Sequence, residues 1–433
     1  MNDVPPPNTG SNTMGQQLQW LERVRWQLGL GVLLCIAFPA ATRYLLTPLW
    51  ISAPTEFNSL CAATIAVVFG YIFLRRLHVF PGINALSYVM PCFSATFALA
   101  VLVMFALRLD YSRLPLFICY IMALAWFGAI FMIVYRDKII RLAIVPGGEA
   151  ERVERLQNVR WQMLQSPEDA LDNCEGIVVD LNADHLEKWE RFIADSALTG
   201  LRVYDVKQVV EQMTGRSEID RLSLNTLGSV NPNEVYFKIK QAIEWLAAGL
   251  ALLLLLPLFG IIALAIRWDS VGPVFFRQER IGFRGIPFRV FKFRTMTHRS
   301  EGFHDDARHS AITLTSDARI TRVGRLLRRS RLDELPQIIN VLQAQMGWIG
   351  PRPEAVALTK WYEKELPFYH YRHIVRPGIT GWAQVCQGHV ADVDDVRNKL
   401  YYDFYYIKNY SFWLDIVIVM LTIKIMITGH GAK

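Results

Sequence analysis

The stretch Ile243–Ile266, IEWLAAGLALLLLLPLFGIIALAI, decides how the second half of this 433-residue chain is built. As a helix its 24 residues would extend over about 36 Å, enough to cross the hydrocarbon core of a bilayer. Lys240 precedes the central apolar run and Arg267 follows it, so both flanks favour the cytoplasmic side. Pro257 removes a backbone hydrogen bond from the middle and kinks the helix. A re-entrant helix–break–helix, which enters and leaves the membrane on one face, satisfies both observations.

Four further apolar stretches lie upstream, each close to or above the roughly 20 residues that a spanning helix needs. They are Leu28–Leu46, Leu60–Leu74, Ile83–Leu107 and Leu114–Tyr135. Any one of them could be a buried core helix, but four in succession predict a four-helix membrane domain over residues 19–141. The Pro-rich residues 1–18 before them are typical of a flexible tail, and no cleavable signal peptide is expected there.

Basic residues set the expected orientation of these helices. The ends expected in the cytoplasm carry Arg23, Arg25, Arg75, Arg76, Arg136, Lys138 and Arg141. The opposite ends carry only Arg43, Arg108 and Arg113. On the positive-inside rule, the N-terminus and everything after Tyr135 face the cytoplasm.

Residues 142–232 change in character and predict a small Rossmann-like α/β domain. The runs Gly176–Leu181 (GIVVDL) and Leu201–Val206 (LRVYDV) indicate strands, and the apolar residues of His185–Leu198 share one face of a helix. Alternating strands and helices predict a parallel sheet. The turn Pro146–Gly148 is similar to a degenerate nucleotide loop, but no GxGxxG is present. A regulatory or assembly role without a ligand therefore stays open beside nucleotide binding.

Composition and charge exclude several classes of protein. Hydrophobic residues make up 52% of the chain and charged residues 20%, and the mean hydropathy is +0.21, which excludes a disordered chain and is too apolar for a typical soluble enzyme. The net charge is +7, yet residues 267–331 alone carry 15 basic and 6 acidic side chains, so this region faces anions. The six cysteines form no CxxC pair and no Cys/His metal spacing, which argues against a disulfide scaffold or a zinc site.

Within the basic region, Ile320–Leu332 (ITRVGRLLRRSRL) predicts an amphipathic helix. Its apolar and basic faces carry, respectively, Ile320, Val323 and Leu327, and Arg322, Arg325 and Arg329. Such a helix can lie on an anionic membrane surface. Nucleic acid is the obvious rival partner, but these arginines follow a membrane hairpin and lack interleaved base-stacking aromatics, so no nucleic acid is expected.

The segment Arg331–Gln337 (RLDELPQ) follows that helix. Pro336 fits the first turn of a new helix, which places Asp333 near its N-cap with Glu334 one residue on. The helix dipole and free amide groups there favour an ionised carboxylate, which could attack phosphorus or hold a divalent cation. On this local sequence alone, a plain N-cap aspartate beside a solvated glutamate is the favoured alternative.

Five motifs, in order, connect these observations. They are Gly272–Arg280 (GPVFFRQER), Lys292–Met296 (KFRTM), Leu332–Gln337 (LDELPQ), Gly350–Pro353 (GPRP) and Arg376–Val385 (RPGITGWAQV). With them, residues 233–433 resemble the mostly α catalytic domain of bacterial polyprenyl-phosphate hexose-1-phosphate transferases, the monotopic phosphoglycosyl transferases. The four helices and α/β domain before it resemble the long form of that family, so the expected fold class is membrane α-helical plus α/β.

The resemblance implies an enzyme of the bacterial inner membrane with its catalytic domain on the cytoplasmic face. It would transfer hexose-1-phosphate from a UDP-hexose, with glucose or galactose as the sugar, to undecaprenyl phosphate, releasing UMP and starting exopolysaccharide, capsule or O-antigen synthesis. It further implies that Asp333 is the nucleophile and contacts Mg²⁺, and that Glu334 assists. A carboxyl-phosphate intermediate divides one transfer into two in-line displacements.

The resemblance also implies phosphate-binding residues. Arg328 matches a phosphate-binding arginine of the family, and Lys292, Arg294 and Arg352 are further candidates for contacts with phosphate. Arg376 could bind phosphate or act as a structural brace. Pro257 matches the proline that breaks the re-entrant helix of the family.

The sequence departs from the family pattern at one place, and two alternatives to the implied function stay open. The family often continues WAQV with Asn-Gly, whereas this chain has Cys386-Gln387-Gly388, so the sugar is not carried over. One alternative is direct transfer in a ternary complex, with Asp333 serving only Mg²⁺. The second is a membrane-anchored sensor or scaffold without catalysis. A homodimer through the membrane helices and α/β domain is also compatible with the sequence.

Overall fold

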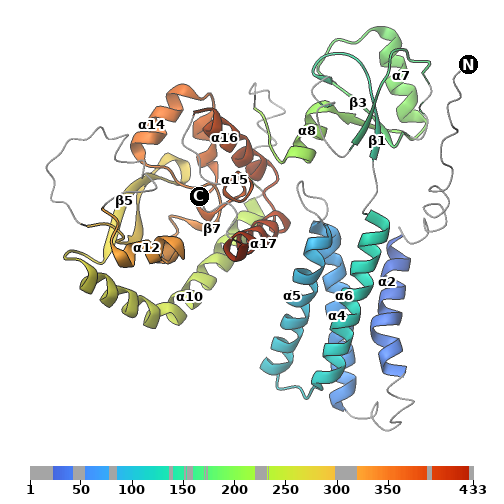
Figure 1. Cartoon of the computed structure of the whole chain (residues 1–433). Coiled ribbons are helices and arrows are strands. Elements are labelled where there is room, and N and C mark those ends of the chain that lie inside the picture. Colours follow the sequence, from blue (N-terminus) through green and yellow to red (C-terminus); the bar gives the residue numbers. More distant parts are fainter. Residues whose placement is uncertain are drawn as a thin grey trace, which may run out of the picture. The chain divides into compact units, whose positions relative to one another are not determined.

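The computed structural model describes residues 23–41, 54–77, 85–135, 140–150, 153, 159–169, 171, 174–219, 232, 234–297, 319–387 and 393–428. The chain divides into two compact units, Met1–Thr214 and Gly215–Lys433 (Figure 1). The predicted tail, residues 1–18, lies outside the described residues.

Four apolar helices form the first part of the first unit. They are α2 (Val24–Val32, continued by the π-helical turn η2, Leu33–Ala37), α4 (Pro54–Leu77), α5 (Ala85–Ala106) and α6 (Arg113–Tyr135). Each is long and apolar enough to cross a membrane. They lie where the sequence predicted apolar helices, although α4 is longer than the predicted stretch and residues 42–46 of the first stretch lie outside the described part.

Close packing between these helices depends on two glycines. A Cβ added at Gly31 would lie 2.8 Å from the ring of Phe127, and one added at Gly70 would lie 2.7 Å from the ring of Phe93. The two rings stack with centroids 4.8 Å apart. The outward faces are apolar as well, with Leu99, Leu102, Phe105, Phe117, Ile121 and Ile133 exposed. A helix bundle that is apolar inside and outside is typical of membrane helices.

The second part of the first unit is the small α/β domain that the sequence predicted. Its four strands pair in parallel in the order β2-β1-β3-β4, and two helices follow β3 and β4 (Figure 1). The elements are β1 (Ile140–Ile144), β2 (Val159–Met163), β3 (Gly176–Val179), α7 (Glu187–Leu198), β4 (Arg202–Asp205) and α8 (Val206–Thr214). The predicted parallel sheet is therefore confirmed.

The turn after β1 lies against the side chain of Asp180. Asp180, at the end of β3, accepts a hydrogen bond from the Glu149 backbone N–H at 3.0 Å. A Cβ added at Gly148, where φ is +57°, would collide with the same carboxylate. A carboxylate thus lies against the turn where a phosphate would have to bind, and its negative charge opposes an anion there. The role of the domain stays a prediction.

The second unit begins with α10 (Glu234–Asp269), a 36-residue helix with Pro257 inside it. Figure 1 shows it as two limbs that meet at an angle, as expected where a proline removes a helix hydrogen bond. One face of each limb packs on the domain, through Ala248 in the first limb and Phe259, Ile262 and Ile266 in the second. The other face exposes Leu246, Leu250, Leu253, Leu254, Leu256, Ile261 and Leu264.

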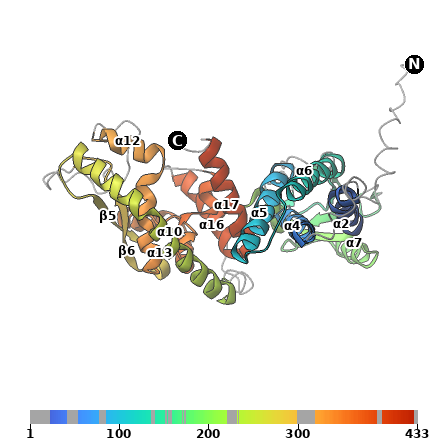
Figure 2. The same ribbon diagram turned by 90° about the horizontal axis from the view of Figure 1, so that it is seen from below.

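Short strands and helices complete the second unit, which is mostly α as predicted. The first half contains the antiparallel hairpin β5 (Phe275–Ile281) and β6 (Pro287–Phe293) with η4 (Phe283–Gly285) between them, then α12 (Arg322–Arg329), η5 (Leu332–Gln337) and α13 (Ile338–Leu342). The second half contains β7 (Gly347–Ile349), α14 (Val356–Glu365), η6 (Tyr369–Ile374), β8 (Gly378–Thr380), α15 (Trp382–Cys386), α16 (Val393–Lys408) and α17 (Phe412–Thr428). Figure 2 shows α10 running beside β5, β6, α12 and α13.

Three contacts hold the first and last segments of this unit in place. Lys240 of α10 forms a buried ion pair with Asp415 of α17 at 2.7 Å, which explains a charged residue in the apolar helix α17. Ser217 donates its backbone N–H to Tyr401 at 3.0 Å, and the Gly215 carbonyl accepts from Trp382 at 2.9 Å. These contacts place Gly215 and Ser217 in the second compact unit. The predicted domain boundary at residue 232 stays a prediction.

Candidate active site

Two cations lie on one carboxylate oxygen of Glu334. The Lys292 ammonium lies 2.9 Å from Glu334 Oε1, and Arg352 Nη2 lies 2.7 Å from the same oxygen. Side chains alternate along β6, so Lys292 points away from the core that its neighbour Phe293 enters. The structure thus brings together three predicted residues from β6, η5 and the segment after β7.

Asp333 lies at the same place without such partners. Its Oδ1 atom is buried and accepts no hydrogen bond within the described part of the chain. Burial, followed by the negative charge of Glu334, raises the pKa of Asp333, and the cations Lys292, Arg328 and Arg331 oppose that rise. Asp333 lies in the first turn of the 3₁₀ segment η5, which leads directly into α13, so it is near a helix start as predicted. Its Oδ1 accepts no backbone N–H there, and the nearby cations are the groups that favour its charged form.

Glu334 behaves in the opposite way. Burial alone would raise its pKa, but Arg352 and Lys292 outweigh it and hold the pKa well below its usual range. Two adjacent carboxyl groups thus have environments that move their pKa values apart, which is a common arrangement where two carboxyl groups have different roles in one reaction. Glu334 is a fixed, paired carboxylate, and Asp333 is the one that can change its bonding.

The backbone before Asp333 is bent sharply. Arg331 has a φ of +58°, in the left-handed region that non-glycine residues seldom adopt. This residue ends α12 and directs the chain into η5. Non-glycine residues in this conformation are concentrated at functional sites, because the surrounding fold must hold them there.

Arg328, on the last turn of α12, faces the same cluster. Its Nε donates to Thr295 Oγ1 at 2.9 Å. Gly324 allows α12 to approach so closely, since a Cβ there would collide with the Thr295 carbonyl oxygen. The predicted amphipathic helix is confirmed in its central part: Val323 and Leu327 pack against the core, and Arg322, Arg325 and Arg329 are exposed. It is shorter than predicted, because Ile320 forms a β-bridge with Met296 before α12 begins and Leu332 belongs to η5.

Two predicted phosphate ligands do not join this cluster. Arg294 is buried, and its guanidinium donates to the Ser270 carbonyl at 2.7 Å and the Val271 carbonyl at 3.0 Å, just after α10. Arg376 lies over the rings of Phe237 and Phe283, 5.4 and 5.8 Å from their centroids. In these contacts both arginines act as structural braces. For Arg376, a brace was one of the two roles that the sequence left open, beside phosphate binding.

Several residues beside the cluster were not identified from the sequence. They are Thr295, Arg280, Glu354, Lys399, Arg372 and Asp403. Thr295 lies within the KFRTM motif and Glu354 directly follows GPRP, so extending the motifs would have found both. Arg372 and Asp403 lie in segments without a motif, and only their pairing in the fold reveals them.

The sequence model of the family described as bacterial sugar transferase matches residues 235–429. A relative from Aeromonas hydrophila is 40% identical over 421 residues, which cover 96% of this chain and 98% of the relative. The chain therefore belongs to the bacterial sugar transferases, as its motifs indicated.

That relative is named UDP-N-acetylgalactosamine-undecaprenyl-phosphate N-acetylgalactosaminephosphotransferase. Two UDP-glucose:undecaprenyl-phosphate glucose-1-phosphate transferases match over shorter lengths. The protein from Escherichia coli (strain K12) is 43% identical over 256 residues, 59% of this chain and 53% of that protein. The protein from Caulobacter vibrioides is 41% identical over 195 residues, 45% of this chain and 71% of that protein.

Proposed function

We propose that this protein transfers a sugar-1-phosphate from a UDP-sugar to undecaprenyl phosphate and releases UMP. The observation that carries the proposal is the half-buried Asp333 side chain, whose buried Oδ1 accepts no hydrogen bond in the described residues and which lies next to Glu334, itself fixed by two cations. A structural carboxylate in such a basic region would be paired. One left unpaired is available to react.

The chemistry proceeds in two displacements. An oxygen of Asp333 attacks the phosphorus that carries the sugar, and the bond from that phosphorus to the UMP oxygen breaks. An oxygen of undecaprenyl phosphate then attacks the same phosphorus and the bond to Asp333 breaks, which regenerates the carboxylate. The side chains of Arg328, Lys292 and Arg352 supply positive charge that stabilises the negative charge on the reacting phosphate in both steps.

Mg²⁺ fits this site. It usually binds through one or two carboxylates together with phosphate oxygens of the substrate, and a free carboxylate oxygen is present at Asp333. The described residues contain no group of three or more His, Cys, Asp or Glu side chains that could hold a metal by themselves. Asp333 would hold the ion jointly with the donor diphosphate, and the ion would neutralise phosphate charge.

The packing of α10 supports a re-entrant placement on the cytoplasmic face of the inner membrane. Ala248 in the first limb and Ile266 in the second both contact the same domain, which carries the charged site. A helix crossing the bilayer would draw those domain contacts into the hydrocarbon, where unpaired polar groups are costly. Two limbs with an apolar outer face can instead dip into one leaflet, next to the lipid acceptor.

The donor sugar is best sought among hexoses and N-acetylhexosamines. The relative that aligns over nearly the whole chain is named for UDP-N-acetylgalactosamine, and the relatives matched over part of it for UDP-glucose. We expect one of these donors, or UDP-galactose, to start a surface polysaccharide on undecaprenyl phosphate.

Mass spectrometry of the intact protein tests the proposal. The protein is incubated with Mg²⁺ and UDP-glucose, UDP-galactose or UDP-N-acetylgalactosamine, without lipid acceptor. A gain of one sugar-phosphate on the Asp333 peptide, with equal release of UMP, is expected for one donor, and none is expected for Asp333→Asn.

Two other outcomes identify the alternatives. UMP release only after undecaprenyl phosphate is added, with appreciable turnover by Asp333→Asn, would favour the ternary complex. No UMP with any donor and acceptor would favour a scaffold. Mass photometry of the same preparation tests the homodimer.

A further inference from the structure

Four consecutive carbonyl groups, from Pro351 to Glu354, are held by residues outside their own segment. The Pro351 carbonyl accepts from the Gly378 N–H at 3.0 Å, and the Glu354 carbonyl accepts from the Ile281 N–H at 3.1 Å. Between them, the Arg352 carbonyl accepts from Arg372 at 2.9 Å and the Pro353 carbonyl from Arg280.

This external bonding replaces regular structure. Proline has no N–H, so Pro351 and Pro353 cannot contribute donors to a helix or sheet. The segment lies between β7 and α14 and belongs to neither. Its path, and with it the direction of the Arg352 side chain, is therefore set by the groups that hold its carbonyls.

Arg372 is the most firmly fixed of those groups. Its Nε and Nη2 lie 3.0 and 2.8 Å from Asp403 Oδ2, and its Nη1 donates to the Tyr369 hydroxyl at 2.7 Å. Arg372, Asp403 and Tyr369 are 3%, 1% and 2% exposed. A guanidinium whose three nitrogens are all bonded makes a rigid donor.

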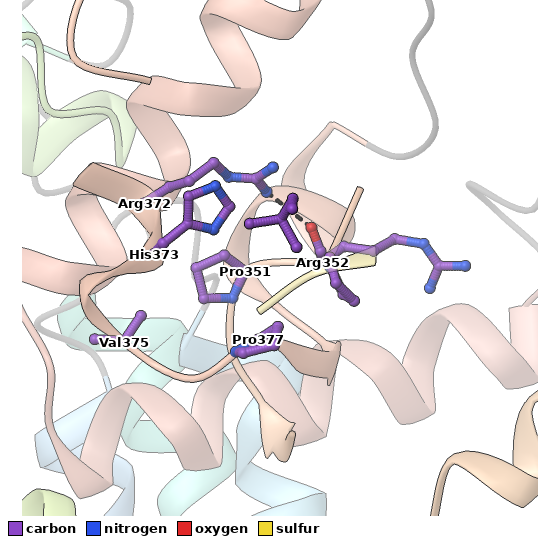
Figure 3. A pocket seen from close by; sticks show the side chains of 8 residues that line it. Pro351, Arg352, Arg372, His373, Val375 and Pro377 are labelled. Carbon is purple, nitrogen blue, oxygen red and sulfur yellow. Dashed lines mark hydrogen bonds between the residues drawn. The ribbon is translucent and has the colours of Figure 1, made fainter. Parts of the chain in front are cut away.

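Figure 3 shows that the carbonyl group and the side chain of Arg352 point in opposite directions. Its carbonyl oxygen faces Arg372, and its side chain points away from Arg372. The guanidinium at the far end holds Glu334, the neighbour of Asp333. The shallow depression that Arg372 and Pro351 both line has no room for a water molecule, so it does not separate this chain of contacts.

We propose that Arg372, held by Asp403, is a positioning residue for the transfer reaction and acts through Arg352. Its charge does not reach the substrate. It fixes the Arg352 backbone so that the Arg352 guanidinium holds Glu334 and leaves Asp333 free. The proposal rests on the proposed function for its kinetic readout, and its structural part stands on the contacts alone.

A double-mutant cycle tests the proposal in the full-length protein. Arg372→Lys and Asp403→Asn are compared with Arg352→Gln, alone and combined. We expect Arg372→Lys and Asp403→Asn to lower kcat about 10- to 100-fold, since small misplacements of a reacting site cost that much, with little change in KM for the UDP-sugar. In the Arg352→Gln background the same substitutions should change kcat by less than about twofold, because the residue they act through is already lost.

Val417→Ala is the matched control. Val417 is fully buried in α17 and is not among the residues whose hydrogen bonds hold the carbonyls of residues 351–354, so this substitution loosens the same unit elsewhere. It should lower the melting temperature and leave kcat nearly unchanged. Two results would overturn the proposal. One is that the effects of Arg372→Lys and Arg352→Gln on kcat are additive, and the other is that Val417→Ala lowers kcat as much as Arg372→Lys does.

A second readout does not depend on turnover. Melting temperatures of Arg372→Lys, Glu334→Gln and the double variant are compared. If Arg372 positions Arg352 on Glu334, the two losses are less than additive. Additive losses overturn the inference even when the protein is fully active, and a wild type that releases no UMP refutes the proposed function while the melting data still decide the inference.

Discussion

The guanidinium of Arg352 spans both carboxylate oxygens of Glu334, with Nη2 2.7 Å from Oε1 and Nη1 3.4 Å from Oε2. Lys292 adds a second cation on Oε1. The neighbouring Asp333 has no such bond in the described residues. The two adjacent carboxylates therefore differ in their bonding. Glu334 is neutralised and held by two cations, whereas Asp333 is available to react.

Replacing Glu334 by glutamine should lower the stability of the protein as well as its transferase activity. Lys292 and Arg352 would lose a shared counter-charge in a site where all three side chains are less than one-fifth exposed. Stranding buried cations costs roughly 3 kcal/mol, which corresponds to roughly 6–12 °C in melting temperature for a unit of this size. Glu279→Gln, an exposed glutamate on β5, is the control and should melt like the wild type. An unchanged melting temperature for Glu334→Gln would contradict the pairing.

The activity should fall on the acidic side of neutrality because of Asp333. Its pKa is raised above the ordinary 3.8, chiefly by burial and then by Glu334, and only the ionised form can attack phosphorus. The acidic limb of kcat/KM against pH therefore lies above pH 3.8. Removing the nearby cation in Arg328→Gln should move that limb to higher pH, because this cation favours the charged carboxylate.

Arg329→Gln is the matched control for this pH profile, since Arg329 is exposed on the same helix and is not among the cations that act on Asp333. Its acidic limb should coincide with that of the wild type. If the wild type, Arg328→Gln and Arg329→Gln gave the same profile, a group other than Asp333 would determine the loss of activity at acidic pH.

The substitution Gly324→Ala should impair activity although Gly324 touches no substrate. An alanine Cβ would collide with the Thr295 carbonyl oxygen, so α12 must move away. Overpacking of this kind costs about 1–3 kcal/mol, and the shift separates Arg328 from Thr295. A higher KM for the UDP-sugar with a lower melting temperature is expected. Alanine is the better helix former, so a stabilised, fully active variant would show that the contact is not needed.

Cysteine labelling tests the re-entrant placement of α10. In a background without the six native cysteines, single cysteines replace Val235 and Val271, which flank the apolar part of α10 and are exposed. Both should react with a membrane-impermeant maleimide only after the cells are opened. A cysteine at Leu109, between α5 and α6, should react in intact cells. Labelling of Val235 and Val271 from opposite faces would establish a spanning helix instead.

Chelation should separate activity from stability. If Asp333 holds Mg²⁺ only together with the donor diphosphate, EDTA abolishes UMP release but leaves the melting temperature of the substrate-free protein unchanged. With a UDP-sugar present, Mg²⁺ should raise the melting temperature, and less so for Asp333→Asn. A fall in the melting temperature of the substrate-free protein on EDTA treatment would indicate a resident structural metal.

The sequence by itself determined the classes of element and the nucleophile candidate. Long apolar runs predict helices because no other structure satisfies the backbone in lipid, and the run with Pro257 gives the bent helix α10. The alternating strands and helices predicted the parallel sheet, whose pairings are all parallel. The resemblance that the motifs carry, and not the local sequence alone, gave Asp333 as the nucleophile candidate and Lys292, Arg328 and Arg352 as candidates for phosphate contacts.

Only the tertiary structure decided what each charged residue does. Arg294 and Arg352 both lie in motifs of the family and were both predicted to bind phosphate, yet one braces the end of α10 and the other holds Glu334. The pKa directions of Asp333 and Glu334 differ for the same reason, since charge and burial come from segments up to 42 residues apart. Arg372 and Asp403 lie 31 residues apart in unremarked sequence. Periodicity and motifs describe local preference, whereas a charge acquires its partner only when distant segments are packed together.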